Sequence, residues 1–236
     1  MTSDKGAAVT AIGCLLETNL STAGMPLGAS TFTLRVPGGQ SAPGTDLVNF
    51  PQLAVITSIS GCVDAPPTTR DCPTEGGTPI TAKLLYTPFG TMITVNGLIV
   101  PTTQVDASTM VFVLPAGTGT AAVNLFSSNG CLASPKLLTY AAPQVQQVHG
   151  CADSGNTTSS CPQDGGTQLS VEGSSFGPSG ALVLVGGKAC VGVTHDASTP
   201  HRKLTCALPA GTGKDVPVVV IAGQVASNAG TLSYAP

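Results

Sequence analysis

Short apolar runs, each bounded by Gly, Pro, Ser or Thr, recur along the whole chain. Apolar and polar residues alternate with a period of two at residues 168–172, where Leu169 and Val171 would face a core. Continuous apolar runs at 181–185 and 216–221 are typical of buried strands. No segment shows a convincing helical period. The pattern therefore predicts a chain made of short strands and tight turns.

A second set of predicted strands lies upstream and follows the same order. About seven short strands in about ninety residues is a count typical of a β-sandwich. The expected strands occupy residues 53–59, 80–86, 92–95, 110–114, 121–126 and 136–140.

An internal repeat explains this recurrence. The motif Gly-Cys-x-Asp begins at Gly61 and again at Gly150, 89 positions later. Three further features recur in the same order: Cys-Pro-x-acid-Gly-Gly-Thr, Leu-Pro-Ala-Gly-Thr-Gly and a closing Tyr-Ala pair. They begin at Cys72 and Cys161, at Leu114 and Leu208, and at Tyr140 and Tyr234.

The first fifty residues resemble the back half of such a repeat, because aligning Val36 with Val220 brings Phe50 opposite Tyr234 without a gap. We therefore expect an incomplete repeat one (residues 1–51), followed by repeat two (52–142) and repeat three (143–236). The predicted fold is all-β, a tandem array of immunoglobulin-like β-sandwiches.

Composition narrows the function classes. Only 9% of the 236 residues are charged, and the nine Lys and Arg leave a net charge of −3. A basic stripe for phosphates is lacking, so nucleic acid is not an expected partner. No run of about 18 apolar residues occurs, so we expect no membrane insertion. The low charge leaves little surface repulsion, which favours lateral association.

The repeated motifs carry a family resemblance. The Gly-Gly-Thr turn, the Phe-Gly pairs at Phe89 and Phe176 and the closing Tyr residues resemble the IPT/TIG family, immunoglobulin-like domains of plexins, transcription factors and surface proteins. The cysteine block resembles, more narrowly, TIG arrays of protist and algal surface or flagellar-hair (mastigoneme) proteins. The resemblance implies an early-set immunoglobulin-like sandwich, and it leaves function open.

Four of the eight Cys form equivalent pairs at the entry of repeats two and three. Cys62 with Cys72, and Cys151 with Cys161, would close short loops as disulfides; the alternative is free buried thiols. So many Cys, without close zinc-type pairs, indicate an oxidising compartment and hence an extracellular or cell-surface location.

A third bridge is predicted by substitution between the repeats. Cys190 and Cys206 stand where repeat two has Val100 and Phe112, so the pair is replaced jointly by apolar residues. This exchange favours a Cys190–Cys206 disulfide inside the sandwich.

Two Cys remain without equivalents, Cys14 and Cys131. They could bond each other between repeats, pair with sequence outside this chain, or link neighbouring molecules. The sequence does not choose between these alternatives.

The polar motifs favour N-glycosylation and turn formation over metal binding. Asn19 and Asn156 begin sequons for N-glycosylation. Carboxylates recur beside the Cys loops at Asp64, Asp153, Glu75 and Asp164, but two per loop is a thin shell for Ca²⁺, and turn-closing roles are expected. We predict no metal site and no cofactor.

No catalytic site is predicted. The three histidines, His149, His195 and His201, do not recur between repeats, and a nucleophile would need an oriented base. The leading hypothesis is a structural subunit of an extracellular fibre, surface coat or flagellar appendage, whose partners are copies of itself or neighbouring repeats. The alternatives are an adhesion module that binds glycans or surface proteins through its loops, and an accessory region of a larger extracellular enzyme.

Overall fold

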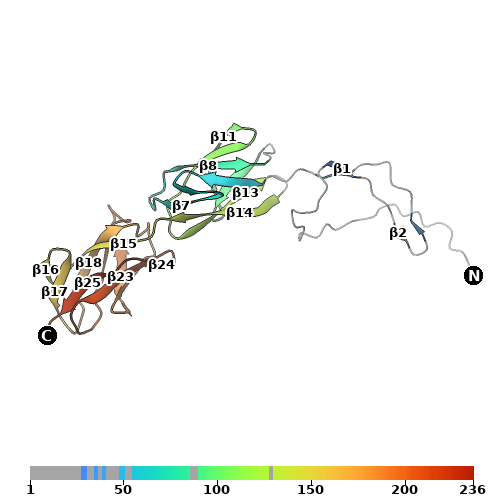
Figure 1. Cartoon of the computed structure of the whole chain (residues 1–236). Coiled ribbons are helices and arrows are strands. Elements are labelled where there is room, and N and C mark those ends of the chain that lie inside the picture. The colour runs from blue at the N-terminus through green and yellow to red at the C-terminus, as the bar shows by residue number, and fades with distance from the viewer. Residues whose placement is uncertain are drawn as a thin grey trace, which may run out of the picture. The chain divides into compact units, whose positions relative to one another are not determined.

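The computed structural model describes residues 55–85, 90–127 and 130–236, together with four short strands among the first fifty residues (Figure 1). The chain divides into two compact units, Met1–Gln52 and Leu53–Pro236. In the first unit two pairs of antiparallel strands are described. They are β1 (Gly28–Ser30) with β4 (Val48–Phe50), and β2 (Arg35–Val36) with β3 (Gly39–Gln40). The proposed half repeat, Cys14 and Asn19 otherwise lie outside the described residues.

Repeat two is a sandwich of two sheets within the second unit. One sheet has the order β10 (Leu98–Val100), β9 (Met92–Val95), β13 (Thr120–Ser127), β14 (Gly130–Tyr140), β7 (Thr68–Cys72) and β6 (Val63–Ala65). The other has the order β11 (Thr102–Asp106), β12 (Thr109–Val113), β8 (Pro79–Leu84) and β5 (Ile56–Ser60).

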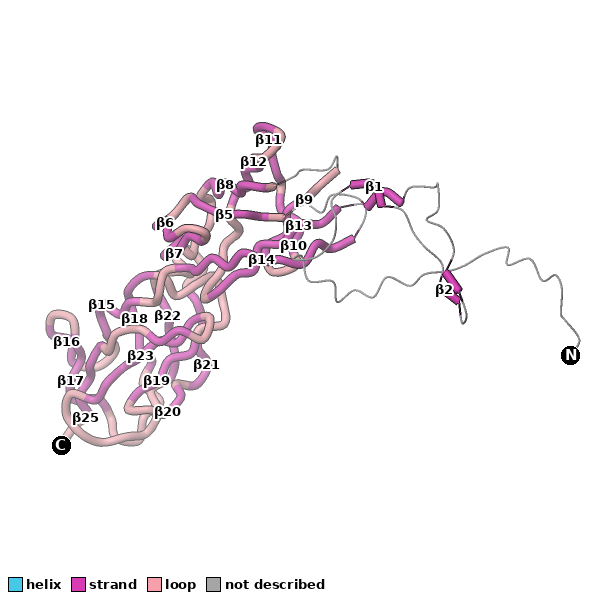
Figure 2. The backbone as a smooth tube through the Cα atoms, turned by 45° about the vertical axis from the view of Figure 1, so that its right-hand side comes forward, coloured by secondary structure: helices cyan, strands magenta, loops and turns pink. Residues whose placement is uncertain are grey.

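Repeat three repeats this arrangement (Figure 2). Its four-stranded sheet has the order β15 (Gln144–His149), β18 (Gln168–Ser174), β22 (Lys203–Ala207) and β21 (Val191–His195). Its larger sheet has the order β16 (Ala152–Ser154), β17 (Thr157–Cys161), β25 (Gly230–Tyr234), β23 (Val216–Ala222), β19 (Leu182–Val185) and β20 (Lys188–Ala189), with β24 (Val225–Ala226) beside β23. The expected fold class is confirmed: the described residues form all-β, immunoglobulin-like sandwiches without a helix.

The segments bounded by Cys62 and Cys72 and by Cys151 and Cys161 differ from the expectation. The sequence suggested loops, whereas each segment is a β-hairpin, β6–β7 or β16–β17. The second strand of each hairpin then pairs in parallel with the closing strand, β7 with β14 and β17 with β25. Each disulfide therefore closes the open end of a hairpin, and the pairing of its second strand with the closing strand adds the hairpin to the edge of the larger sheet.

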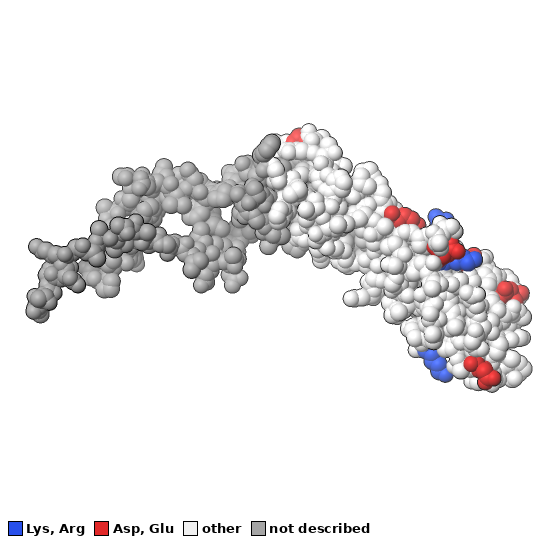
Figure 3. All heavy atoms as spheres, turned by 180° about the vertical axis from the view of Figure 1, so that it is seen from behind, with Lys and Arg blue, Asp and Glu red and all other residues white. Residues whose placement is uncertain are grey.

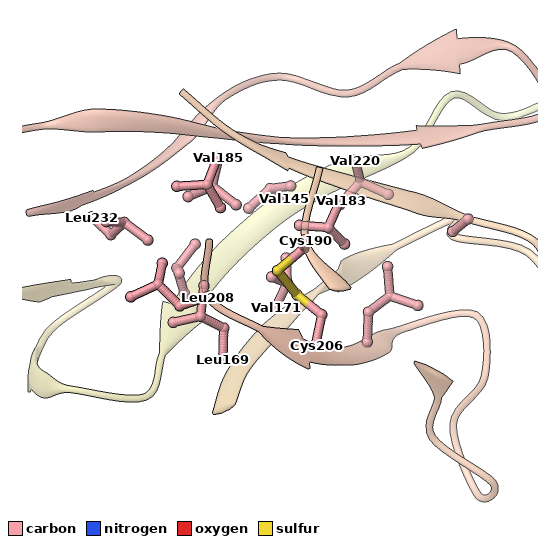
Figure 4. Close-up of a cluster of buried hydrophobic side chains, with 14 of the residues drawn as sticks. Val145, Leu169, Val171, Val183, Val185, Cys190, Cys206, Leu208, Val220 and Leu232 are labelled. Atoms are coloured by element: carbon pink, nitrogen blue, oxygen red, sulfur yellow. A yellow bond between two sulfur atoms is a disulfide. The ribbon is translucent and has the colours of Figure 1, made fainter. Parts of the chain in front are cut away.

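The two cores are separate clusters of alternating inward-facing side chains. In repeat two, Val100 and Phe112 are buried, and Cys190 and Cys206 are buried in repeat three. Figure 4 shows the Cys190–Cys206 disulfide in the middle of the second core, beside Val171, Val183 and Val220. A covalent bridge in one repeat thus stands where the other repeat has apolar packing.

The surface carries few charges. Figure 3 shows one face on which most of the described atoms belong to uncharged residues, with Lys, Arg, Asp and Glu in small scattered groups. In the part of the chain that the structure describes, no helix is present that would be long and apolar enough to cross a membrane.

We predict that the Cys190–Cys206 bridge stabilises repeat three measurably. The two cysteines that it joins are 16 positions apart in the sequence. Replacing both residues by Ala should lower the free energy of unfolding by about 3 kcal/mol, because the unfolded chain gains conformational freedom. The pair Cys190→Val with Cys206→Phe copies repeat two and should recover part of this loss by filling the core. Denaturant unfolding measures both, and equal stability of the Ala variant and the parent would contradict the prediction.

Candidate functional site: the joint between repeats two and three

Two turns of repeat two, whose motifs recur in repeat three, are joined to each other by backbone hydrogen bonds. Gly77 N donates to Leu114 O over 2.8 Å, and Gly117 N donates to Thr74 O over 2.9 Å. Gly76 has a φ of 72°, and a Cβ there would lie 2.6 Å from Leu114 O, so only glycine permits this approach. The Gly-Gly-Thr and Leu-Pro-Ala-Gly-Thr-Gly motifs therefore form one structural element.

The closing Tyr140 fixes this element from the side. Its hydroxyl donates a hydrogen bond of 2.7 Å to Pro115 O, and its ring occupies the space that a Cβ on Gly117 would need. Burial raises the pKa of Tyr140 to about 12. Its backbone N donates to Gly119 O, and Ala141 N donates to Cys72 O, each over 2.8 Å. We call the two turns with the closing Tyr the end face of a repeat.

Three loops of repeat three lie against this end face. The first follows β18 and contains Phe176 and Gly177. Phe176 is fully buried in the core, and its backbone N donates to His201 O over 2.9 Å. Gly177 has a φ of 81°, and a Cβ there would collide with Cγ2 of Thr118 in repeat two. The Phe-Gly pair therefore combines a core anchor with a position where the neighbouring repeat comes into contact.

The second loop, between β21 and β22, is braced by side chains. Ala181 N donates to His195 Nε2 over 3.2 Å, so Nδ1 carries the proton and donates to Pro200 O over 2.7 Å. Asp196 accepts hydrogen bonds from the hydroxyl and backbone N of Ser198 and from Thr199, which lower the pKa of Asp196 to about 2. The loop is thereby held in one conformation just before His201.

The joint is the set of contacts that these loops make with repeat two. The ring Nδ1 of His201 lies 3.0 Å from Thr74 Oγ1. In the third loop, the backbone of Gly223 lies so close to Gly119 that neither residue has room for a side chain. The joint therefore comprises Thr74, Thr118 and Gly119 of repeat two with Gly177, His201 and Gly223 of repeat three. It belongs to one compact unit.

The predicted disulfide cysteines are brought together in pairs. The Sγ atoms lie 2.05 Å apart in Cys62–Cys72 and 2.11 Å apart in both Cys151–Cys161 and Cys190–Cys206. Cys131 lies in β14, opposite Phe126 in the β13 register, and its side chain lies outside the described residues.

The sequon residue Asn156 is exposed in the turn between β16 and β17. The hydroxyl of Thr158, its sequon partner, is buried and accepts a hydrogen bond of 2.9 Å from Cys151 N. Glycosylation of Asn156 stays a prediction.

The recurring carboxylates close turns. Gly61 N donates to Asp64 Oδ1 over 2.9 Å, and Gly150 N donates to Asp153 Oδ1 over 3.0 Å. A hydrogen bond from the Thr158 side chain, together with the one from Gly150 N, lowers the pKa of Asp153. Glu75 accepts from Thr74 Oγ1 over 3.4 Å and lines, with the loop around His201, the edge of the joint. Among the described residues no group of three or more potential ligands could hold a metal ion.

The histidines have structural contacts. Both ring nitrogens of His195 are used within repeat three, and His201 belongs to the joint. His149 lies beside Gln147 Oε1 at 3.2 Å and Asp153 Oδ2 at 3.6 Å. None of these contacts involves a serine or cysteine nucleophile. Sequence reasoning did not assign His201 to the joint, because its partner Thr74 is 127 positions away.

Comparison with known proteins identifies repeat three. Residues 155–234, about a third of the chain, match the model of the IPT/TIG domain. The resemblance predicted from the sequence is confirmed for this repeat, whereas the narrower likeness to flagellar-hair proteins stays a prediction. Among curated proteins nothing matches the sequence.

Several solved structures are similar at low identity. The surface glycan-binding protein PbSGBP-B from Prevotella bryantii has a TM-score of 0.47 at 14% identity, over 76% of this chain and 42% of that one. The plexin A4 extracellular region has a TM-score of 0.35 at 16% identity, over 84% of this chain and 18% of that one. The titin I9–I11 tandem has a TM-score of 0.31 at 12% identity, over 89% and 75%. The chain thus spans less than half of the length of the first two.

We predict that Tyr140 makes the protein sensitive to alkali. Its pKa of about 12 in the folded state exceeds the value of about 10 of an exposed Tyr. The stabilisation that the neutral side chain gives the folded state is therefore complete below pH 10 and is lost as the pH rises towards 12. Tyr140→Phe should remove this part of the alkaline loss. At pH 7 it should cost about 1 kcal/mol, because the hydrogen bond to Pro115 O is lost. Urea titrations between pH 7 and 12 test this, and superimposable pH profiles would contradict it.

We predict that Gly177→Ala weakens the joint more than its backbone conformation explains. Gly187 has the same φ of 81°, and a Cβ there meets nothing within 4 Å, so Gly187→Ala measures the conformational cost alone, about 1 kcal/mol. Gly177→Ala should cost more, because its methyl group collides with Thr118.

The rescue variant combines Gly177→Ala with Thr118→Ser, which removes Cγ2. Its loss in the free energy of unfolding should fall towards that of Gly187→Ala. Free energies from denaturant unfolding, with ¹⁵N relaxation of both repeats, provide the readout. Equal losses of unfolding free energy in Gly177→Ala and Gly187→Ala would show that the contact with Thr118 contributes nothing to stability.

Proposed function

We propose that this chain is a non-catalytic structural subunit of an extracellular fibre, surface coat or flagellar appendage, assembled through its tandem immunoglobulin-like repeats. The joint is the observation that carries the proposal. Backbone contact at Gly119 and Gly223 and the His201–Thr74 contact hold successive repeats directly against each other. Repeats that contact each other in this way are better suited to a spacer or a fibre element than domains joined by flexible linkers.

An extracellular location is supported by the three disulfides, because cytosolic thiols are kept reduced. The two hairpin bridges also restrain the edge of the larger sheet, where unpaired strand edges could associate wrongly. Disulfides at these places favour durability outside the cell.

Recognition of proteins or glycans through loops is the competing function. Three loops at one end of repeat three contact repeat two, so the surface that contains His201, Gly177 and Gly223 is already used within the chain. Catalysis has less support, because His195 and His201 have structural roles. These observations favour a structural role over recognition through these three loops and over catalysis within this chain.

Immunogold electron microscopy of the producing cells tests the proposal, with an antibody raised against residues 53–236. We expect gold particles along an extracellular fibre, coat or appendage. Gold particles on single, dispersed molecules in the medium would contradict the proposal that the protein is a structural subunit. A glycan array in parallel distinguishes the competing function, since saturable binding to one glycan class would favour recognition.

A further inference from the structure

The end face of repeat three has the same backbone framework as the end face of repeat two. Gly166 N donates to Leu208 O, and Gly211 N donates to Gln163 O, each over 2.8 Å. Gly165 has a φ of 74°, and a Cβ there would lie 2.5 Å from Leu208 O, as at Gly76. The two motifs therefore build the same element twice.

The closing residues also correspond. Tyr234 OH donates to Pro209 O over 2.8 Å, and its ring fills the space beside Gly211. Tyr234 N donates to Gly213 O over 2.9 Å, and Ala235 N donates to Cys161 O over 2.7 Å. These bonds set the direction in which the chain leaves repeat three, as the equivalent bonds of Tyr140 and Ala141 do for repeat two.

The two end faces differ in what covers them among the described residues. Thr118 and Gly119 contact Gly177 and Gly223 of the next repeat, whereas their equivalents Thr212 and Gly213 are exposed. An open depression of about 520 Å³ lies there. Its lining includes Gln163, Thr212, Gly213, Lys214, Tyr234 and Ala235.

We infer that this end face is a docking site for one further IPT/TIG-like repeat of the same polypeptide, which would lie on it as repeat three lies on repeat two. This inference rests on the proposed function and names the partner of the array. The partner must have glycine where Gly177 and Gly223 lie, because the backbone at Thr212 and Gly213 needs close approach. Gln163 stands in place of Thr74, so the side chain facing it must form a hydrogen bond with an amide instead of a hydroxyl.

A repeat in the same chain is favoured over a separate molecule by the length of the connection. β14 ends at Tyr140 and β15 begins at Gln144, so the joint forms across a very short linker. Such a linker gives a high effective concentration, which lets a small interface form that would be weak between separate molecules.

The test extends the full chain with a second copy of residues 142–236 placed directly after Ala235, which reproduces the native linker. We expect the amide resonances of Gln163, Thr212 and Gly213 to shift, and the added repeat to tumble at the same rate as repeat three in ¹⁵N relaxation. Thr74 and Thr118 in the same spectrum report the native joint as an internal standard.

The discriminating variant is Thr212→Arg in the extended chain, which puts a long charged side chain where the added repeat would dock. It should reverse the resonance shifts and release the added repeat. Thr194→Arg is the matched control, because Thr194 is also exposed but lies on the edge strand β21. It should leave both readouts unchanged.

Independent tumbling of a folded added repeat, with unchanged resonances at Gln163, Thr212 and Gly213, would overturn the inference. So would an added repeat that stays unfolded while repeat three is folded, because docking should stabilise it. Either result would leave the proposed structural role standing, since that role is decided by where the native protein is found in the cell.

Discussion

The reciprocal backbone bonds between two glycine-containing turns organise each repeat. They join the segment after the cysteine hairpin to the segment that precedes the last strands, two places far apart in the sequence. In repeat two the bonds run from Gly77 to Leu114 and from Gly117 to Thr74. The approach is so close that a side chain at Gly76 or Gly117 would collide with backbone or with the ring of Tyr140. Buried backbone groups must find partners, and here each turn satisfies the other.

This coupling links the core to the joint. Tyr140 packs into the core and holds Pro115 O, and the turn that contains Pro115 carries Thr118 and Gly119 at its tip. On the other side, Phe176 is buried in the second core and is followed at once by Gly177. Each contact in the joint therefore lies within two or three residues of a buried anchor. The contacts between the repeats therefore depend on the packing within each repeat, and only a short connection separates β14 from β15.

Much of the fold could be predicted because the repeat displays its pattern twice. The apolar runs marked β9, β19 and β23 closely, since alternation and turn residues are local signals. Repeat two has Val100 and Phe112 where repeat three has Cys190 and Cys206, and this paired replacement indicated from sequence alone that the two positions lie close together. All four side chains are buried. The hairpins β6–β7 and β16–β17 were missed, because their residues are mostly polar and their pairing with β14 and β25 is parallel and distant in sequence.

The candidate site could be predicted only as a set of motifs. Sequence by itself determined the repeat, the sandwich class, the cysteine pairs and the positions of the Gly-Gly-Thr, Leu-Pro-Ala-Gly-Thr-Gly and Phe-Gly elements, because these depend on local geometry and on recurrence. Only the tertiary structure decided that the Leu-Pro-Ala-Gly-Thr-Gly turn of repeat two meets the Phe-Gly pair of repeat three, and that Thr74, just before the Gly-Gly-Thr turn, meets His201. The contacts Thr74–His201 and Thr118–Gly177 join residues with no shared sequence pattern, because the folded backbones of the two repeats bring them together.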